Sequence, residues 1–425
     1  MSVDGGAVGA QARPDDREKA PLLSVEEARS RIVGALDVLG NESVALADAL
    51  GRVLAADIRA RFSHPPAAVS SMDGYALRSQ DAASLPLRLR RIGASRAGES
   101  FDGIVAPGTC VRIFTGATMP RGADLIALQE DASESDGHVT IDAVPAKGKF
   151  IRPAGFDFPA GAVCTTRGEV LTARRVGLLA MAGHNAVPVI RKPKVAVLAT
   201  GDELVPPGET PGKDQIVGSN SVALSAAIAG WGGAPVDLGI VADRREAIAA
   251  ALDRARSADL LVTTGGASVG EHDLVHAGLA ERGFALDFWR IAMRPGKPLM
   301  FGQAAGLPVL SLPGNPVSAL VCALLFLRPA MAAMLGLANT QPVFERAMLT
   351  GPLPANDRRE DYLRARLEIA ADGRACVETF PTQDSSMLMT LTHADVLVRR
   401  RPFAAPAQAG DLVEVIRFDR LDSML

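Results

Sequence analysis

The sequence predicts a multidomain protein of the α/β plus β class, built around a central doubly wound α/β domain. The chain has 425 residues, which corresponds to about three domains at roughly 150 residues per domain. Between residues 194 and 337, continuous apolar strands alternate with helices, a pattern typical of a parallel sheet covered on both faces. The regions 59–152 and 341–425 contain short β-like runs separated by Gly and Pro instead.

The composition excludes several classes of protein. The net charge of −3 offers no basic surface for nucleic acid. The 4 cysteines are far apart and predict neither a zinc ribbon nor a disulfide framework. Residues 1–21 contain acidic residues and no apolar core, so we expect a disordered tail rather than a signal peptide. The longest apolar run, Val317 to Leu327, is too short to span a bilayer. We therefore expect a cytoplasmic protein without nucleic-acid or membrane partners.

The first half of the chain predicts an interrupted helical domain. Ser24 and Glu27 have the spacing of a capping box that opens an amphipathic helix. Further helices are expected at 44–54 and 171–182. Because the β-rich module lies between them, residues 22–58 and 155–191 are predicted to form one discontinuous, elongated helical domain, with 59–154 inserted as a β-rich domain.

The second half predicts an α/β domain at 192–340 and a small β domain at 341–425. In the α/β domain, strands are expected at 195–199, 236–241, 260–263 and 309–312. The helices between them are expected at 221–228 and 244–255, and a last helix from Pro316 towards Leu335. Asn220 or Ser221 is the expected cap of one helix, and Asn315 of the last, with Pro316 at its first position. In the C-terminal domain, strands are expected at 362–369, 375–380, 396–399 and 412–416.

Gly and polar residues follow three of these strands. The segments are Thr200-Gly201-Asp202-Glu203, Thr263-Thr264-Gly265-Gly266-Ala267-Ser268 and Pro313-Gly314-Asn315. The carboxyl ends of parallel strands meet at one edge of a sheet, where ligands bind. Gly lets backbone N–H groups approach an anion, and helix N-termini favour negative charge. A phosphate-bearing ligand is therefore expected, and ordinary turn chemistry is the alternative.

Carboxylates also gather at this edge. Asp202, Glu203, Asp243, Glu271 and Asp273 follow successive strands. Mg²⁺ binds one or two carboxylates together with phosphate oxygens, so a magnesium site is expected. The alternative is that these residues only favour helix N-termini. His272 and His276 lie four residues apart and could share a metal, but a surface or capping role is the preferred interpretation.

Positive charge lies in Arg290 and in the pentapeptide Arg294-Pro295-Gly296-Lys297-Pro298. Two Pro residues restrict this loop, and stiffly held cations suit an oxyanion. Without further context, a solvated turn explains the loop equally well.

Taken in order, the motifs are similar to those of the molybdopterin molybdenumtransferase family, which includes MoeA and the gephyrin E domain. Residues 70–76 resemble its S-x-M-D-G-Y-A signature. Further matches follow in the family's order, and they are 112–117, 119–120, 122–124, 129–130, 200–204, 265–270 with Asp273, 295–298 and 312–318. The resemblance covers the chain from about residue 22 onward.

The resemblance implies an enzyme that inserts molybdenum from molybdate into adenylylated molybdopterin, with Mg²⁺ and with release of AMP. It implies an elongated homodimer whose active cleft lies between the α/β domain and the partner subunit's C-terminal β domain. The adenylyltransferase that makes the substrate is the implied pathway partner. Two other activities are alternatives: molybdopterin adenylylation itself, because the α/β fold is shared, and a non-catalytic, gephyrin-like scaffold.

The resemblance also assigns residues. The implied metal and pyrophosphate ligands are Glu203, Asp243 and Asp273. Polar cleft residues implied in the inserted module are Asp73, Thr115, Arg152 and Asp157. The implied molybdate-binding positions are Arg294, Lys297, Ser318, Arg359 and Ser385. The implied substrate-binding positions on the strand-end loops and nearby are Thr200, Gly201, Gly265, Gly266, Ser268, Arg290, Pro313, Gly314 and Asn315. Arg290 and Arg294 stand where many members have Lys, and the chain has only 7 Lys among its basic residues, so a general drift to Arg is preferred over tungstate selectivity.

Overall fold

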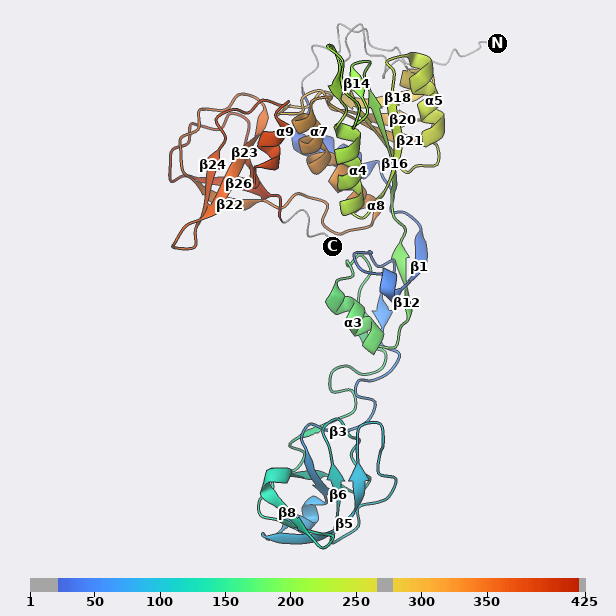
Figure 1. Cartoon of the computed structure of the whole chain (residues 1–425), viewed down its shortest axis with the longest axis vertical. Helices are drawn as coiled ribbons and strands as arrows, with labels where there is room; N and C mark the ends of the chain where they lie inside the picture. Colours follow the sequence, from blue (N-terminus) through green and yellow to red (C-terminus); the bar gives the residue numbers. More distant parts are fainter. Residues whose placement is uncertain (1–21, 266–277, 420–425) are drawn as a thin grey trace, which may run out of the picture. The chain divides into compact units, whose positions relative to one another are not determined.

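The computed structural model describes residues 22–265 and 278–419 (Figure 1). Residues 43–50 and 54–189 form one compact unit, and the rest of the described chain forms the other. We call them the second and the first unit, respectively. The predicted tail at residues 1–21 lies outside the described residues.

The first unit contains a six-stranded mixed sheet. Its strands, in spatial order, are β16 (Ala234–Val241), β13 (Lys194–Thr200), β17 (Leu260–Thr264), β21 (Leu307–Leu312), β20 (Met300–Ala304) and β18 (Phe284–Trp289). The first four are parallel, as predicted. β20 and β18, which were not predicted, pair antiparallel with their neighbours, and β18 forms the edge of the sheet.

Helices cover both faces of this sheet. Along β13, Val195 and Val197 pack into one core while Ala196 and Leu198 pack into the other, because successive strand residues point to opposite faces. The first face carries α2 (Val25–Gly34), α4 (Asn220–Gly230), α7 (Pro316–Cys322), the π-helical η4 (Ala323–Leu327) and α8 (Arg328–Met334). The second face carries α5 (Arg245–Ala255).

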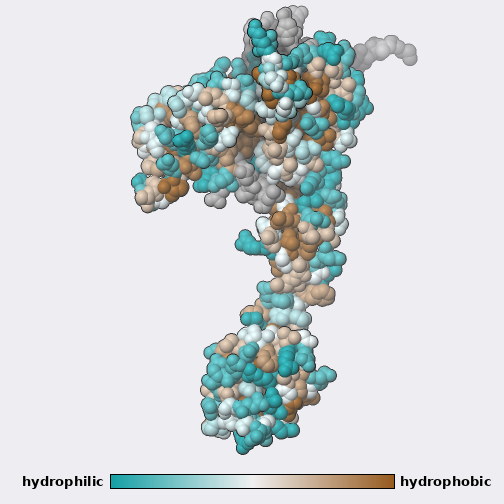
Figure 2. Space-filling model, in the orientation of Figure 1, coloured by the Kyte–Doolittle hydropathy of each residue, from teal (hydrophilic) through white to brown (hydrophobic). Residues whose placement is uncertain are grey.

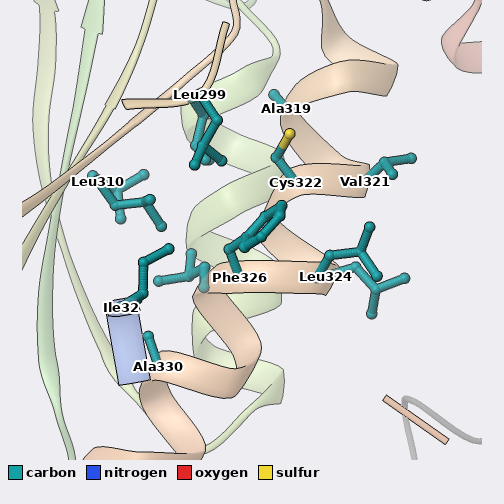
Figure 3. Packing of buried hydrophobic residues seen from close by; sticks show 14 of the residues in the cluster. Ile32, Leu299, Leu310, Ala319, Val321, Cys322, Leu324, Phe326 and Ala330 are labelled. Atoms are coloured by element: carbon teal, nitrogen blue, oxygen red, sulfur yellow. The ribbon is translucent and has the colours of Figure 1, made fainter. Parts of the chain in front are cut away.

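The apolar helix Pro316–Met334 is a core helix. It is 19 residues long, and its most apolar stretch is 83% buried inside the fold. Figure 3 shows Cys322 and Phe326 on this helix among Ile32, Leu299 and Leu310. The helix predicted from Pro316 towards Leu335 is confirmed, because the chain continues as helix through Arg328 and Pro329 to Met334.

The C-terminal part of the first unit is a β-barrel. The barrel strands are β22 (Glu345–Leu349), β23 (Glu360–Ile369), β24 (Ala375–Thr379), β25 (Val396–Arg400) and β26 (Leu412–Arg417), of which β22 was not predicted. β25 pairs with both β26 and β23, which closes the barrel. β19 (Met293–Arg294) pairs with β23, and α9 (Leu388–Thr392) precedes β25. The predicted C-terminal β domain is confirmed.

The second unit contains a six-stranded sheet of order β7 (Leu125–Leu128), β4 (Gly74–Leu77), β6 (Thr109–Ile113), β5 (Leu87–Ser95), β9 (His138–Ile141) and β8 (Ala132–Ser135). Its short strand pairs are β2 (Ile58–Arg59) with β11 (Val163–Thr165) and β3 (Val69–Ser70) with β10 (Ile151–Arg152). The helix expected at 171–182 is α3 (Ala173–Met181), capped by the Thr172 hydroxyl.

The helix predicted at 44–54 is wrong. This segment contains the end of β1 (Asn41–Ala45) and one 3₁₀ turn, η1 (Leu46–Asp48). β1 pairs with β12 (Ala186–Ile190). The backbone N–H groups of Leu46 and Ala55 donate to the carbonyls of Asn185 and Pro188, so this chain segment bonds to a distant one rather than to itself. At the other predicted helix start, Ser24 caps α2 by accepting a hydrogen bond from the Glu27 N–H at 3.1 Å.

Candidate active site

A cavity of about 810 Å³ lies at the carboxyl edge of the parallel strands, within the first unit. The segments that follow β13, β17 and β21 line it, with the cationic loop 294–298 and residues 383–386 of the barrel. This volume is in the range of pockets that hold small molecules and cofactors. The prediction that the strand ends meet at one edge is confirmed.

Close backbone contact at this edge requires glycine. Gly265 has a φ of +96°, and a Cβ atom there would lie 2.3 Å from the Thr200 carbonyl oxygen. A Cβ atom on Gly314 would lie 3.6 Å from the Gly265 Cα. The loops after β13 and β17 therefore meet through backbone atoms at Gly265, and the loop after β21 lies beside them in ordinary van der Waals contact.

Asn220 ties these loops together. Its side-chain amide donates to the Gly314 carbonyl at 2.6 Å and to the Thr264 hydroxyl at 2.8 Å. Asn220 or Ser221 was the predicted cap, but Ser219 precedes α4 and Asn220 is its first helical residue. The run Gly218-Ser219-Asn220-Ser221 marked a helix start, but sequence alone gave no sign that Asn220 would reach two other loops.

Carboxylates from the segments after β13 and β16 also meet. The Asp243 N–H donates to the Asp202 carboxylate at 3.1 Å. Burial raises the pKa of Asp243, and the negative charges of Asp202 and Glu203 raise it further. Glu203 alone among the three lines the cavity. In the described ranges, no group of three or more His, Cys, Asp or Glu residues could hold a metal ion.

The cationic loop borders the cavity, but its charge is partly compensated. Arg294, Lys297 and Arg359 line the wall. Arg294 pairs with the buried Asp361, and Arg359 pairs with Asp357 at 2.7 Å. The hydrogen bonds from Arg359 lower the pKa of Asp357 to about 2, so this carboxylate stays ionised. Lys297 makes no ion pair with any residue that the structure describes.

Arg290 lies outside the cavity wall. Its guanidinium stacks on the Trp289 ring at 3.8 Å from the centroid, and its φ is +70°. Arg290 therefore does not join Arg294 and Lys297 in the cavity wall, although the sequence places these three cations close together.

The barrel contributes to the start of α7. The Asn315 side-chain amide donates to the Ser385 hydroxyl at 2.8 Å, and the Val317 N–H donates to the Ser385 carbonyl at 3.1 Å. Asn315 was expected to cap the helix with its own side chain, but no such bond forms. The buried Ser318 lines the cavity beside it.

The barrel of this chain forms part of the cavity wall. It supplies Arg359 and residues 383–386 to the cavity, because β19, directly before the cationic loop, pairs with β23 of that barrel. The contribution of a partner's C-terminal domain, which the resemblance implies, stays a prediction.

The second unit holds two further groups of predicted residues. The Asp73 carboxylate accepts hydrogen bonds from both the N–H and the hydroxyl of Thr115, each at 2.8 Å, and these bonds lower its pKa. Arg152 and Asp157 line a separate cavity of about 610 Å³ with His64 and the exposed Phe156. Sequence order alone could not show that Asp73 bonds to Thr115 while Arg152 and Asp157 line a different cavity.

Some predicted residues lie outside the described residues: Gly266, Ser268, Glu271, His272, Asp273 and His276. The strand-end residues Thr200, Gly265, Pro313, Gly314 and Asn315 all line the large cavity. Gly201 lies beside it, with a backbone φ of +151°.

Comparisons with known proteins cover nearly the whole described chain. Three family models match: "MoeA N-terminal region (domain I and II)" at 23–183, "Probable molybdopterin binding domain" at 196–333 and "MoeA C-terminal region (domain IV)" at 346–418. A Haemophilus influenzae protein named molybdopterin molybdenumtransferase is 33% identical over 94% of this chain and 100% of its own length. A Bacillus subtilis protein of the same name is 31% identical over 94% of this chain and 95% of its own length.

Solved structures agree with the sequence relatives. A molybdopterin biosynthesis MoeA protein from Pyrococcus horikoshii superposes with a TM-score of 0.82 at 30% identity, covering 94% of this chain and 99% of its own. A second structure from the same organism gives a TM-score of 0.80 at 27% identity, with 94% and 100% coverage.

Proposed function

Because the chain belongs to the MoeA family of molybdopterin molybdenumtransferases, we propose that the cavity at the sheet edge transfers molybdenum from molybdate to adenylylated molybdopterin and releases AMP. The protein acts in molybdenum cofactor biosynthesis. In this reaction two Mo–S bonds replace two Mo–O bonds, and molybdenum keeps its oxidation state. The displaced oxygens leave as water with the two thiol protons and two protons from solvent, and water cleaves the phosphoanhydride to AMP.

The observation that carries the proposal is that strand-end loops and cationic side chains line the same cavity. The loops at Gly265 and Gly314 present backbone groups beside the starts of α4 and α7, which suits phosphate groups. Arg294, Lys297 and Arg359 present cations, which suit a tetrahedral oxyanion such as molybdate. Lys297 is the cation best placed to meet molybdate, because carboxylates already pair with the two arginines.

Mg²⁺ would be held by Glu203, Asp243 and Asp273. The donors are all carboxylate oxygens, which this ion prefers. The raised pKa of Asp243, caused first by burial and then by its acidic neighbours, fits a position at which a cation would stabilise the ionised form. The bound ion would offset negative charge on the phosphate oxygens.

We also propose a homodimer in which Asp73, Thr115, Arg152 and Asp157 contribute to a site shared between subunits. The two hydrogen bonds from Thr115 keep the Asp73 carboxylate ionised and oriented. The division into a discontinuous helical domain, an inserted β domain, the α/β domain and the barrel is part of the same proposal. So are a cytoplasmic location and a molybdopterin adenylyltransferase as the supplier of the substrate.

The reaction can be tested against the two alternatives with purified protein. If the protein inserts molybdenum, it should release AMP from adenylylated molybdopterin, and this release should depend on molybdate. Consumption of ATP with molybdopterin alone would instead show an adenylyltransferase. Absence of both reactions in a folded protein would favour a scaffold.

A further inference from the structure

We propose that Leu204 and Ile216 form an apolar wall of the large cavity that contacts the face of a planar heteroaromatic ring of the ligand. The choice of ligand rests on the proposed function, whose substrate carries an adenine and a pterin. The placement of the wall rests on the strand geometry alone.

The two side chains share one face of a small ladder. β14 (Leu204–Val205) pairs in parallel with β15 (Ile216–Val217), and Leu204 lies opposite Ile216. Both residues line the cavity, and so does Val217, whereas Val205 is buried and does not. This ladder therefore gives the cavity an apolar wall in which Ile216 is the most exposed side chain.

The backbone holds this wall in place. The Ile216 N–H donates to the Glu203 carbonyl at 2.8 Å, and the Gly218 N–H donates to the Val205 carbonyl at 2.9 Å. Residues 206–215, which connect the two strands, are exposed throughout. After this exposed connection, the chain pairs again with β14, so that Ile216 lies beside Leu204. Ile216 is 58% exposed.

The wall gives the cavity two chemically different sides. Leu204 and Ile216 are apolar, while Arg294, Lys297 and Arg359 are cationic. A ligand that satisfies both sides has an anionic group and a flat apolar surface. Phosphorylated adenine and phosphorylated pterin have this shared chemistry, and ring-free sugar phosphates do not.

A single exposed isoleucine is common on protein surfaces, so a matched control is needed. Ile369 on β23 provides it, because it is 61% exposed and does not line the cavity. The variants are Ile216→Ser and Ile369→Ser in the full-length protein. The probes are AMP, a pterin monophosphate and ribose 5-phosphate, with affinities measured by calorimetry.

We expect Ile216→Ser to weaken the binding of AMP or of the pterin monophosphate by about tenfold, since an apolar contact is lost. Ribose 5-phosphate affinity should not change, and Ile369→Ser should change nothing. If the affinity falls for only one of these two probes, that probe carries the ring that the wall contacts. In methyl-labelled wild-type protein, the same ring should shift the Ile216 methyl resonance.

Equal weakening for ribose 5-phosphate, unchanged affinity for both rings, or no methyl shift with either ring would overturn the proposal. Its failure is separable from that of the proposed function. If AMP release depends on molybdate but Ile216→Ser leaves the affinity for both rings unchanged, the proposed function stands and the apolar wall is refuted. If ring binding depends on Ile216 but the protein releases no AMP, the apolar wall stands and the proposed function is refuted.

Discussion

The side-chain amide of Asn315 donates a 2.8 Å hydrogen bond to the hydroxyl of Ser385, 70 residues away. The bond joins the start of α7 to a loop of the barrel, and the neighbouring Val317 N–H bonds to the Ser385 carbonyl. The cavity wall is therefore continuous across the α/β sheet and the barrel. Its shape depends on contacts that neither part makes alone.

Removal of this bond should weaken molybdate binding. Ser385→Ala deletes the hydroxyl but keeps the carbonyl that accepts the Val317 N–H. We expect the KM for molybdate to rise about fivefold, which corresponds to the loss of about 1 kcal/mol for one hydrogen bond. Steady-state AMP release at varied molybdate measures it. In a double-mutant cycle with Asn315→Ala, additive effects would contradict the coupling.

Substitution of Gly265 should disrupt the cavity. In Gly265→Ala, the new Cβ would lie 2.3 Å from the Thr200 carbonyl oxygen at a φ of +96°, so β13 and β17 must move apart. We expect a loss of more than about 1 kcal/mol of stability, together with loss of activity. Thermal unfolding measures the first effect. The control is Gly230→Ala, because nothing lies within 4 Å of its Cβ position. A Gly265→Ala protein as stable as this control would refute the close contact.

Asn220 should act as a positioning residue. Asn220→Asp replaces the amide donor with a carboxylate that faces the Gly314 carbonyl and no longer donates to it. We expect kcat/KM to fall by about ten- to a hundredfold, since leaving a polar group unpaired costs roughly 1–3 kcal/mol. The control is Asn339→Asp, whose side-chain oxygen accepts the Gln341 N–H and is retained. A normal rate for Asn220→Asp, with an unchanged KM for molybdate, would remove Asn220 from the site.

Most of the loops that line the cavity could be predicted from the sequence, because the end of each strand is marked by residues next to it in the chain. Apolar runs predicted β13, β17 and β21, and Gly with polar residues marked the turns after them. Parallel pairing then brought these turns together. Ser24 capped α2 for the same reason, since its partner Glu27 lies three residues away.

The missed features depend on long-range partners. β1 takes strand form because its chain segment bonds to the region near Asn185. β18 and β20 pair antiparallel with each other, and neither has the continuous apolar run of a buried parallel strand. Asn220 reaches loops 44 and 94 residues further along the chain. Local pattern carries no information on such contacts.

The second unit should lose stability in acid through Asp124. Hydrogen bonds from Lys147 and from the Ser79 N–H lower the pKa of this carboxyl to about 2. Because the folded pKa is below the unfolded value of about 4, the ionised carboxylate stabilises the fold above that value. This stabilisation is lost as the pH falls from about 4 to about 2.

Asp124→Asn should therefore be less stable than wild type at neutral pH and equal to it near the bottom of this range. The neutral-pH difference should be about 1 kcal/mol, because solvent screens the partly exposed ion pair. Thermal melts across the acid range measure it, with the exposed Asp214→Asn as the control. A difference that does not change with pH would contradict the assignment to Asp124.

The account depends most on the coupling of molybdate to AMP release in the large cavity. The direct measurement is AMP production from adenylylated molybdopterin by wild type and by Lys297→Met, with and without molybdate and Mg²⁺. We predict that wild type releases AMP only when both are present. Lys297→Met should require much more molybdate, because the cavity loses a cation that no carboxylate within the described residues neutralises. AMP release that proceeds equally well without molybdate would contradict the account.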